Sequence, residues 1–387
     1  MTSRRRHLRP RSSAAGPLED DDLLSEILLR LPPQPSSLPR ASAVCKRWHL
    51  LVSDPAFSRR FRIHHRRSPP LLGFFDDDPG RSFLPTLEAP NRVPPGRFSS
   101  QSQSLDSDRS ALLCLGCRHG LVLLFDLTFF SFLVWDPVTG QQHRLARPPG
   151  FDPEGWAVNG AVLRAGPDVQ HFQVVLVVAG DDDKQQRRVF ACVYSSETAG
   201  WGNVISTLIE SKVPNVLPNR VGMVPAVLVG DALYWILTGS SSSILGFDRK
   251  RQILEFDLER QKLVVIRTPV VVDVSHDNRF TVVREDGGGL GFLVVEDFTA
   301  QLWKWKTNFD GDNNLLVLHN DFGLFTVQLQ SLQFKKLSGN NNLSHRHSFE
   351  SVYTKQALEV DMAKLIFCKM HNMIVWLSRN LQLHSGG

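Results

Sequence analysis

The sequence contains no uninterrupted run of eighteen apolar residues, so we expect no membrane-spanning helix in its 387 residues. Its five cysteines are odd in number and irregularly spaced, a pattern that argues against a disulfide framework. The chain does not begin with the charged segment, apolar segment and cleavage site of a signal peptide, so no secretory signal is expected. Together these absences favour a reducing compartment, the nucleus or the cytoplasm.

Catalytic signatures are missing as well. The sequence has no G-x-S-x-G and no H-E-x-x-H motif, and the glycine run at 287–289 lacks the lysine of a phosphate-binding loop. Cys114 and Cys117 lie close to His119, but no second pair of ligands follows at the spacing of a zinc site. Buried or edge cysteines are therefore the preferred interpretation. We expect no catalytic residue, no cofactor and no metal.

Positive charge is concentrated at the front of the chain. Residues 1–70 hold 14 Lys and Arg against 6 Asp and Glu, whereas the remainder is nearly neutral. This distribution argues against a nucleic-acid surface on the larger part. Residues 1–17 contain five arginines and no acid, which predicts a disordered basic tail. A nuclear-import patch and a transit peptide are the alternatives for this tail.

Helical periodicity begins after this tail, and three helices are predicted. Asp20, Asp21 and Asp22 favour a helix start, and the stripe that follows ends at a double proline. A serine at 36 or 37 can cap a second helix, which we expect to continue through Val52. Asp54 and Pro55 then predict the start of a third. The stripe of the first helix consists of Leu23, Leu24, Ile27, Leu28 and Leu31.

This small helical unit carries more large apolar side chains than it can bury. A bundle of about 40 residues has a marginal core and needs support from a neighbour. The surplus predicts a partner surface. A DNA-binding helix-turn-helix is the rival interpretation, but the connection PPQPSS and the aliphatic end of the second helix do not fit one.

From about residue 71 to 354 the pattern changes to short apolar runs separated by Gly, Asp, Pro and Asn, which predicts β-strands. Apolar strands reach turns near Pro137, Glu197, Leu258 and Gln330, roughly 60–70 residues apart, and polar strands follow. This spacing favours propeller blades with long loops. Strands and helices do not alternate, so a parallel α/β sheet is not expected.

The front segment resembles an F-box, the module that docks onto Skp-family adaptors of cullin–RING ubiquitin ligases. The resemblance rests on Leu23-Leu24, Glu26-Ile27-Leu28, Arg30-Leu31-Pro32, Val44-Cys45-Lys46-Arg47-Trp48 and Asp54-Pro55-Ala56-Phe57. One position departs from the family, which usually opens with Leu-Pro, because Glu19 follows Leu18 here. The F-box is expected to span residues 18–62.

The β region resembles the F-box-associated β-propeller of a large plant family, through pieces such as HGLVLL, LVWDPVTGQ and ILEFDLERQKL. We expect a linker with first strands at 63–110, the propeller-like domain at 111–354 and an atypical helical tail at 355–387. The chain between 307 and 323 is short for another blade, which is compatible with an incomplete or locally remodelled propeller. The fold class is thus mainly β with a small N-terminal α domain.

The resemblance implies the substrate-recognition subunit of an SCF-type ubiquitin ligase, a non-catalytic adaptor. Its F-box would bind a Skp-family adaptor and, through it, a cullin, while the propeller would bind an unknown target protein. The alternative is a non-degradative propeller binding protein with a vestigial F-box. Neither nucleic acid nor membrane is expected as a partner. The residues implied in adaptor binding are Leu23, Leu24, Ile27, Leu28, Leu31, Pro32, Val44, Cys45 and Trp48.

Overall fold

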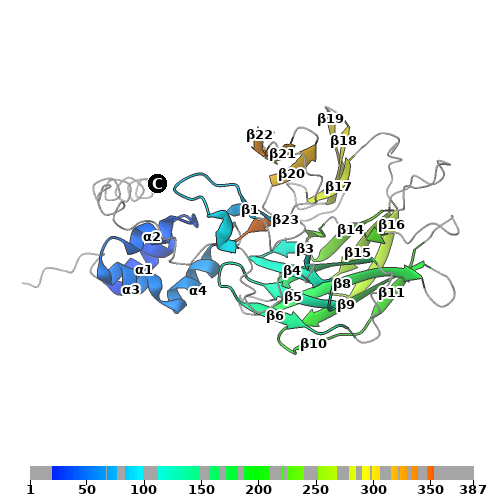
Figure 1. The fold of residues 1–387 in the computed structure, drawn as a ribbon, viewed down its shortest axis with the longest axis horizontal. Helices are drawn as coiled ribbons and strands as arrows, with labels where there is room; N and C mark the ends of the chain where they lie inside the picture. The colour runs from blue at the N-terminus through cyan, green and yellow to red at the C-terminus, as the bar shows by residue number, and fades with distance from the viewer. Residues whose placement is uncertain are drawn as a thin grey trace, which may run out of the picture.

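A computed structural model shows a small group of helices beside a larger β body (Figure 1). The structure describes residues 20–66, 68–75, 83–98, 112–148, 157–165, 171–181, 187–209, 220–221, 225–238, 252–267, 279–284, 290–296, 299–305, 315–320, 323–328, 333–338 and 347–352. The predicted basic tail at 1–17 and the predicted helical tail at 355–387 lie outside these residues.

Four helices form the front unit, where the sequence predicts three. The second predicted helix is two helices, because Cys45 adopts an extended backbone between them. Ser, Val and Cys have weak helix propensity, which makes the segment around this residue a poor helix interior. The helices are α1 (Asp21–Leu29), α2 (Ser37–Ser42), α3 (Lys46–Ser53) and α4 (Pro55–His64).

The described strands of the β body form six antiparallel sheets, five of which follow one another along the chain. The first of the five contains β3 (Leu112–Arg118), β4 (Leu121–Asp126), β5 (Ser131–Trp135) and β6 (Gln142–Leu145). The second contains β7 (Ala157–Arg164), β8 (Phe172–Asp181), β9 (Arg187–Ser195), β10 (Gly200–Trp201) and β11 (Ile205–Leu208). The third contains β12 (Arg220–Val221), β13 (Val227–Val229), β14 (Ala232–Thr238), β15 (Gln252–Asp257) and β16 (Lys262–Arg267).

Two three-stranded sheets continue the series. They consist of β17 (Arg279–Arg284), β18 (Leu290–Glu296) and β19 (Thr299–Trp305), and of β20 (Leu315–Asn320), β21 (Gly323–Gln328) and β22 (Gln333–Ser338). The stretch from 307 to 323 is short, but it contains β20, the first strand of a further sheet. The series of sheets therefore continues past this stretch. Three of the four predicted turns are confirmed between paired strands, after β5, β9 and β15, and the fourth lies outside the described residues.

The sixth sheet joins the two ends of the β body. It contains β1 (Leu71–Phe75), β2 (Phe83–Pro85) and β23 (His347–Glu350), and β1 pairs antiparallel with both of the others. Figure 1 shows β23 beside β1, although some 270 residues separate them in the sequence. A short 3₁₀ helix, η1 (Pro95–Phe98), follows β2. The strand at 71–75 is therefore part of the β body, because it pairs with the last described strand of that body.

Successive sheets pack on one another through separate hydrophobic clusters. One cluster joins the closing sheet to β3–β5, with Phe75, Phe83, Phe98 and Phe349 at its centre. The next lies between β3–β6 and β7–β9, a third between β7–β11 and β13–β16, and a fourth reaches β17 and β18. Sheets that follow in the chain and pack face to face make a propeller-like arrangement. The predicted fold class, mainly β with a helical front, is confirmed.

The helical unit shares its core with the β body, as its small size requires. Val352, two residues after the end of β23, is buried in the same cluster as Leu24, Trp48 and Phe61. The Ser36 hydroxyl also donates a 2.7 Å hydrogen bond to Asn91 Oδ1. Within the part of the chain that the structure covers, no helix has the length and apolar character needed to cross a membrane.

Candidate functional site

The first helix starts where its sequence places an N-cap. The Asp20 carboxylate accepts hydrogen bonds from the backbone N–H of Asp22 at 2.8 Å and of Leu23 at 3.1 Å. Asp21 and Asp22 add negative charge in the first turn, where the helix dipole favours it. The helix therefore has a fixed start, which decides which side chains of its stripe face inward.

The fourth helix starts in the same way. Asp54 caps it by accepting from the N–H of Ala56 at 3.1 Å, and Pro55 occupies the first position. Phe57 and Phe61 lie one turn apart, are both buried, and stack with their centroids 6.2 Å apart. This helix closes the core of the unit from the side that faces the β body.

Polar contacts fix the first helix to the third and the fourth. Arg47 of α3 pairs with Asp21 at 2.7 Å. Arg60 of α4 pairs with Glu26 at 2.5 Å and donates to the Ser25 hydroxyl at 3.1 Å. The two ion pairs are exposed and contribute at most about 1 kcal/mol each. These pairs orient the helices: Arg47 holds the start of α3 against the start of α1, and Arg60 holds α4 against α1.

The nine residues implied in adaptor binding divide into three groups in the structure. Leu24, Leu28 and Trp48 are buried in the core of the unit. Ile27 and Leu31 are half-buried. Only the remaining four are exposed to a partner, namely Leu23, Pro32, Val44 and Cys45.

A further exposed side chain belongs with this group. Leu50 in α3 has 71% of its surface exposed, more than Leu23 at 50% or Val44 at 37%. Sequence reasoning missed it because it lies beside the stripe that contains Trp48, Leu51 and Val52. A leucine off the buried stripe of an amphipathic helix is itself the signal that could have found it. We call Leu23, Val44 and Leu50 the exposed apolar set.

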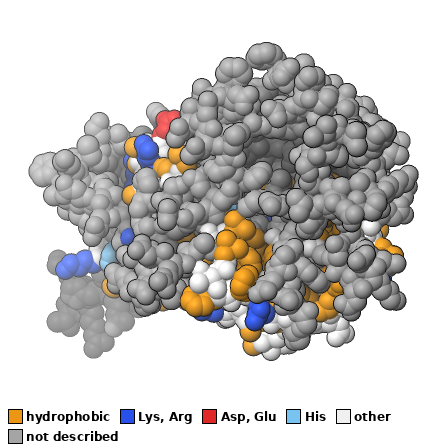
Figure 2. All heavy atoms as spheres, turned by 45° about the vertical axis from the view of Figure 1, so that its right-hand side comes forward, with side chains coloured by type: hydrophobic (Ala, Val, Ile, Leu, Met, Phe, Trp, Pro, Cys, Tyr) orange, Lys and Arg blue, Asp and Glu red, His pale blue; other side chains and the backbone are white. Residues whose placement is uncertain are grey.

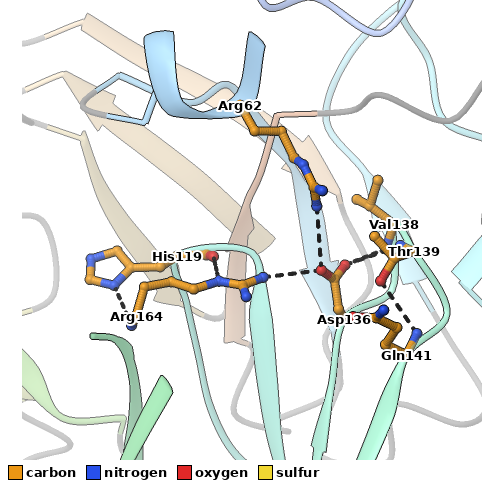
Figure 3. A network of polar contacts seen from close by, with 7 residues as sticks. All are labelled: Arg62, His119, Asp136, Val138, Thr139, Gln141 and Arg164. Carbon is orange, nitrogen blue, oxygen red and sulfur yellow. Dashed lines mark hydrogen bonds and ion pairs between the residues drawn. The ribbon is translucent and has the colours of Figure 1, made fainter. Parts of the chain in front are cut away.

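A buried carboxylate connects the helical unit to two sheets of the β body (Figure 3). Asp136, which follows β5, is 6% exposed, and its Oδ2 atom lies 3.0 Å from Arg164 at the end of β7. Arg62 of α4 approaches the same oxygen at 3.9 Å. The other oxygen, Oδ1, accepts from the N–H groups of Val138 and Thr139 at 3.0 and 3.1 Å. We call Asp136, Arg62 and Arg164 the arginine joint.

His119 borders the arginine joint and remains neutral there. Its Nδ1 atom accepts a 3.2 Å hydrogen bond from the Arg164 N–H, which requires the proton to sit on Nε2 (Figure 3). Although the residue is partly exposed, desolvation of the ring and the positive charges of Arg118 and Arg164 lower its pKa to about 4. At neutral pH, His119 therefore adds no positive charge to the two arginines of the joint.

Cys114 and Cys117, the pair considered for a metal site, lie in an environment that disfavours thiolate ligands. Cys114 and Cys117 approach at 3.9 Å between sulfur atoms, and burial raises the pKa of the Cys114 thiol well above its ordinary value. A metal ligand must be a thiolate, so this environment opposes coordination. Among the described residues, no cluster of three or more His, Cys, Asp or Glu side chains could hold a metal ion.

Most of the large apolar side chains that the structure describes in the β body are buried, but a few reach the surface. Figure 2 shows hydrophobic side chains on one face, with Lys or Arg side chains beside some of them. Among the large apolar residues of the β body whose burial the structure describes, Leu127, Phe129, Val204 and Leu208 are the exposed ones. These residues sit in one turn and at the ends of β11.

Comparison with known proteins gives matches over the helical unit and over most of the chain. Residues 21–64 match the F-box-like family. F-box protein At5g49610 of Arabidopsis thaliana is 25% identical over 301 residues, which cover 75% of each protein. F-box/kelch-repeat protein At3g61590 of the same plant is 27% identical over 234 residues, 58% of this chain and about half of that protein, 52%.

Solved structures give a weaker likeness. A chain in the nidogen/laminin complex matches 71% of this chain and 95% of its own length, with 12% identity and a TM-score of 0.33. The β-propeller domain of the trilobed protease from Pyrococcus furiosus covers 62% of this chain and 67% of that chain, with 12% identity and a TM-score of 0.26.

Proposed function

Since this chain is a plant F-box protein, with an F-box-like unit in front of a propeller-like body, we propose that it is the substrate-recognition subunit of an SCF-type cullin–RING ubiquitin ligase. Its front unit binds a Skp-family adaptor and, through it, a cullin. Its β body binds a target protein. F-box proteins are typically non-catalytic adaptors, and we assign this chain the same role in the nucleus or the cytoplasm.

The exposed apolar set carries this proposal. The helical unit has a buried core, to which Val352 of the β body contributes, yet it still exposes Leu23, Val44 and Leu50. Stable protein interfaces bury on the order of 1,200–2,000 Å² in total and centre on apolar side chains. Pro32 and Cys45 are exposed on the same unit and extend the surface available to an adaptor. Leu24, Leu28 and Trp48 act indirectly, by holding the helices that present this set.

In this role the chain itself catalyses no step and contributes by bringing two other proteins close together. A target held on the β body and a ubiquitin-loaded enzyme held on the cullin become parts of one complex, which converts an encounter into an intramolecular step. The arginine joint supports this role, because it connects the adaptor-binding unit directly to two sheets.

The test is reconstitution of the complex from purified proteins. The full chain is mixed with a Skp-family adaptor and a tagged cullin, and the cullin is recovered. We expect the chain to be recovered only when the adaptor is present. Recovery without the adaptor, or no recovery of a folded chain in either mixture, would refute the proposal.

The alternative function, a non-degradative binding protein with a vestigial F-box, has one observation in its favour. The Leu-Pro pair that usually opens the family is absent, since Glu19 follows Leu18. In the same experiment, this alternative predicts that the folded chain is not recovered with the cullin even when the adaptor is present. Retention of the chain on the assembled cullin complex would exclude it.

A further inference from the structure

One exposed turn of the β body combines exposed apolar side chains with neighbouring arginines. The turn joins β4 to β5, and within it Leu127 is 45% and Phe129 59% exposed. Turn residues are usually Gly, Asn, Asp or Ser, so two exposed large apolar residues are unusual in this position. The Asp126 carboxylate accepts from the N–H groups of Thr128 and Phe129 at 3.0 and 3.1 Å, which fixes the turn.

Positive side chains lie beside this turn. Arg144 of β6 reaches within 4.0 Å of Asp126 Oδ2 and keeps half of its side chain exposed. Such a long ion pair leaves guanidinium donors for a second carboxylate. Arg147 follows at the same end of β6 and is exposed. Both acids within 112–148, Asp126 and Asp136, are buried, so this sheet presents no exposed acid to balance the arginines.

The turn lies away from the helical unit. Strand β5 runs from Ser131, next to the turn, to Trp135, which precedes Asp136 of the arginine joint. The first and last residues of this strand lie about 13 Å apart. A partner bound at the turn would therefore leave the exposed apolar set open to an adaptor.

We propose that Leu127, Phe129, Arg144 and Arg147 form a docking surface for the target, and that the target segment carries an acidic residue beside a bulky apolar side chain. The proposal rests on the proposed function, because it names the surface with which the β body holds its target. The exposed side chains of the turn supply apolar contact, and the two arginines select for carboxylates through charge complementarity.

Selection from a displayed library of random twelve-residue peptides tests this proposal. The immobilised full chain is the bait, and no adaptor is present, so failure of adaptor binding would not affect the result. We expect enrichment of peptides with Asp or Glu next to Phe, Leu or Trp. Selection without acidic enrichment, or no selected peptide at all, would overturn the proposal.

Variants of the full chain then locate the binding surface. The most enriched peptide, labelled with fluorescein, is titrated with wild type, with Leu127→Ser/Phe129→Ser and with Arg144→Gln. We expect each variant to bind at least about ten-fold more weakly, since few interface residues carry most of the affinity. Leu208→Ser removes a comparably exposed side chain from β11, which belongs to another sheet, and should bind as wild type does. An equal loss of affinity in the control variant, or no loss of affinity in the other two variants, would overturn the proposal. Matching thermal unfolding curves verify that all variants are folded.

Discussion

Asp20 determines where the first helix begins and therefore how α1 presents Leu23. Replacement by Ala removes the acceptor for two backbone N–H groups. We expect Asp20→Ala to destabilise the helical unit by about 1 kcal/mol, measured as a shift in its urea unfolding midpoint. Asp22→Ala is the control, because it keeps the cap and removes only a first-turn charge. An equal effect of both variants would contradict the capping role.

His119 makes stability depend on pH. The pKa is about 4 in the folded protein against an ordinary value of 6.5, so the unfolded chain binds this proton more readily. The contribution of His119 to stability is therefore complete above pH 6.5 and is lost as the pH falls toward 4. Urea unfolding of wild type and His119→Asn at pH 7.5 and pH 4.5 measures this contribution.

Asn is a suitable replacement for His119, because the residue has a positive φ of 53°, which Asn tolerates, and the Asn oxygen can accept from Arg164. We expect the variant to lose less stability than wild type between the two pH values. An identical loss in both proteins would show that the proton binds elsewhere.

At the scale of elements, the arginine joint connects α4, β5 and β7. Asp136→Asn keeps an oxygen for the turn but removes the charge that faces Arg164 at 3.0 Å. Breaking a buried ion pair of this kind costs about 3–5 kcal/mol. Arg62→Gln removes only the 3.9 Å contact, and we expect it to cost less than about 1 kcal/mol. Calorimetric melting of the two variants compares them, and similar losses would contradict the central place of Asp136 and Arg164.

The close approach of two sheets depends on Gly160 in β7. A Cβ atom there would lie 2.9 Å from Leu176, 3.0 Å from Leu123 and 3.0 Å from a backbone oxygen. We expect Gly160→Ala to destabilise the protein by about 1–3 kcal/mol through overpacking. At Gly116 the nearest atom would be 3.7 Å away, so Gly116→Ala should have little effect. Chemical unfolding measures both, and a neutral Gly160→Ala would show that the sheets can separate without cost.

Local signals in the sequence predict local structure well here. The caps at Asp20 and Asp54, the helix stop at Pro32 and three hairpin turns are confirmed because each depends on neighbouring residues. The break at Cys45 was not predicted, since the apolar stripe continues across it. Likewise, periodicity identifies which helical residues share a stripe but not which of them the β body covers. That is why the implied adaptor residues divide into buried and exposed groups only in the structure.

At the scale of the whole molecule, the closing sheet could not be read from sequence. Pairing of β1 with β23 joins strands about 270 residues apart, and no local pattern records such a contact. This pairing puts Val352 into the core of the helical unit. The first strands of the β body and its last described strand therefore lie together. The exposed apolar set is thus held on a body whose two ends are joined.

The central claim is that this set binds a Skp-family adaptor, and isothermal titration of the adaptor into the full chain tests it most directly. Substitutions at Leu28 or Trp48 would disrupt the core, so the exposed leucines are the ones to change. The informative variant is Leu23→Asp/Leu50→Asp. Its control is Leu208→Asp, which changes an equally exposed leucine, at 49%, on the β body.

We expect measurable binding by wild type and by Leu208→Asp, and an affinity at least about a hundred-fold lower for the double variant, because two charges would enter an apolar interface. Unchanged affinity of a folded Leu23→Asp/Leu50→Asp protein, or no binding by folded wild type, would contradict it.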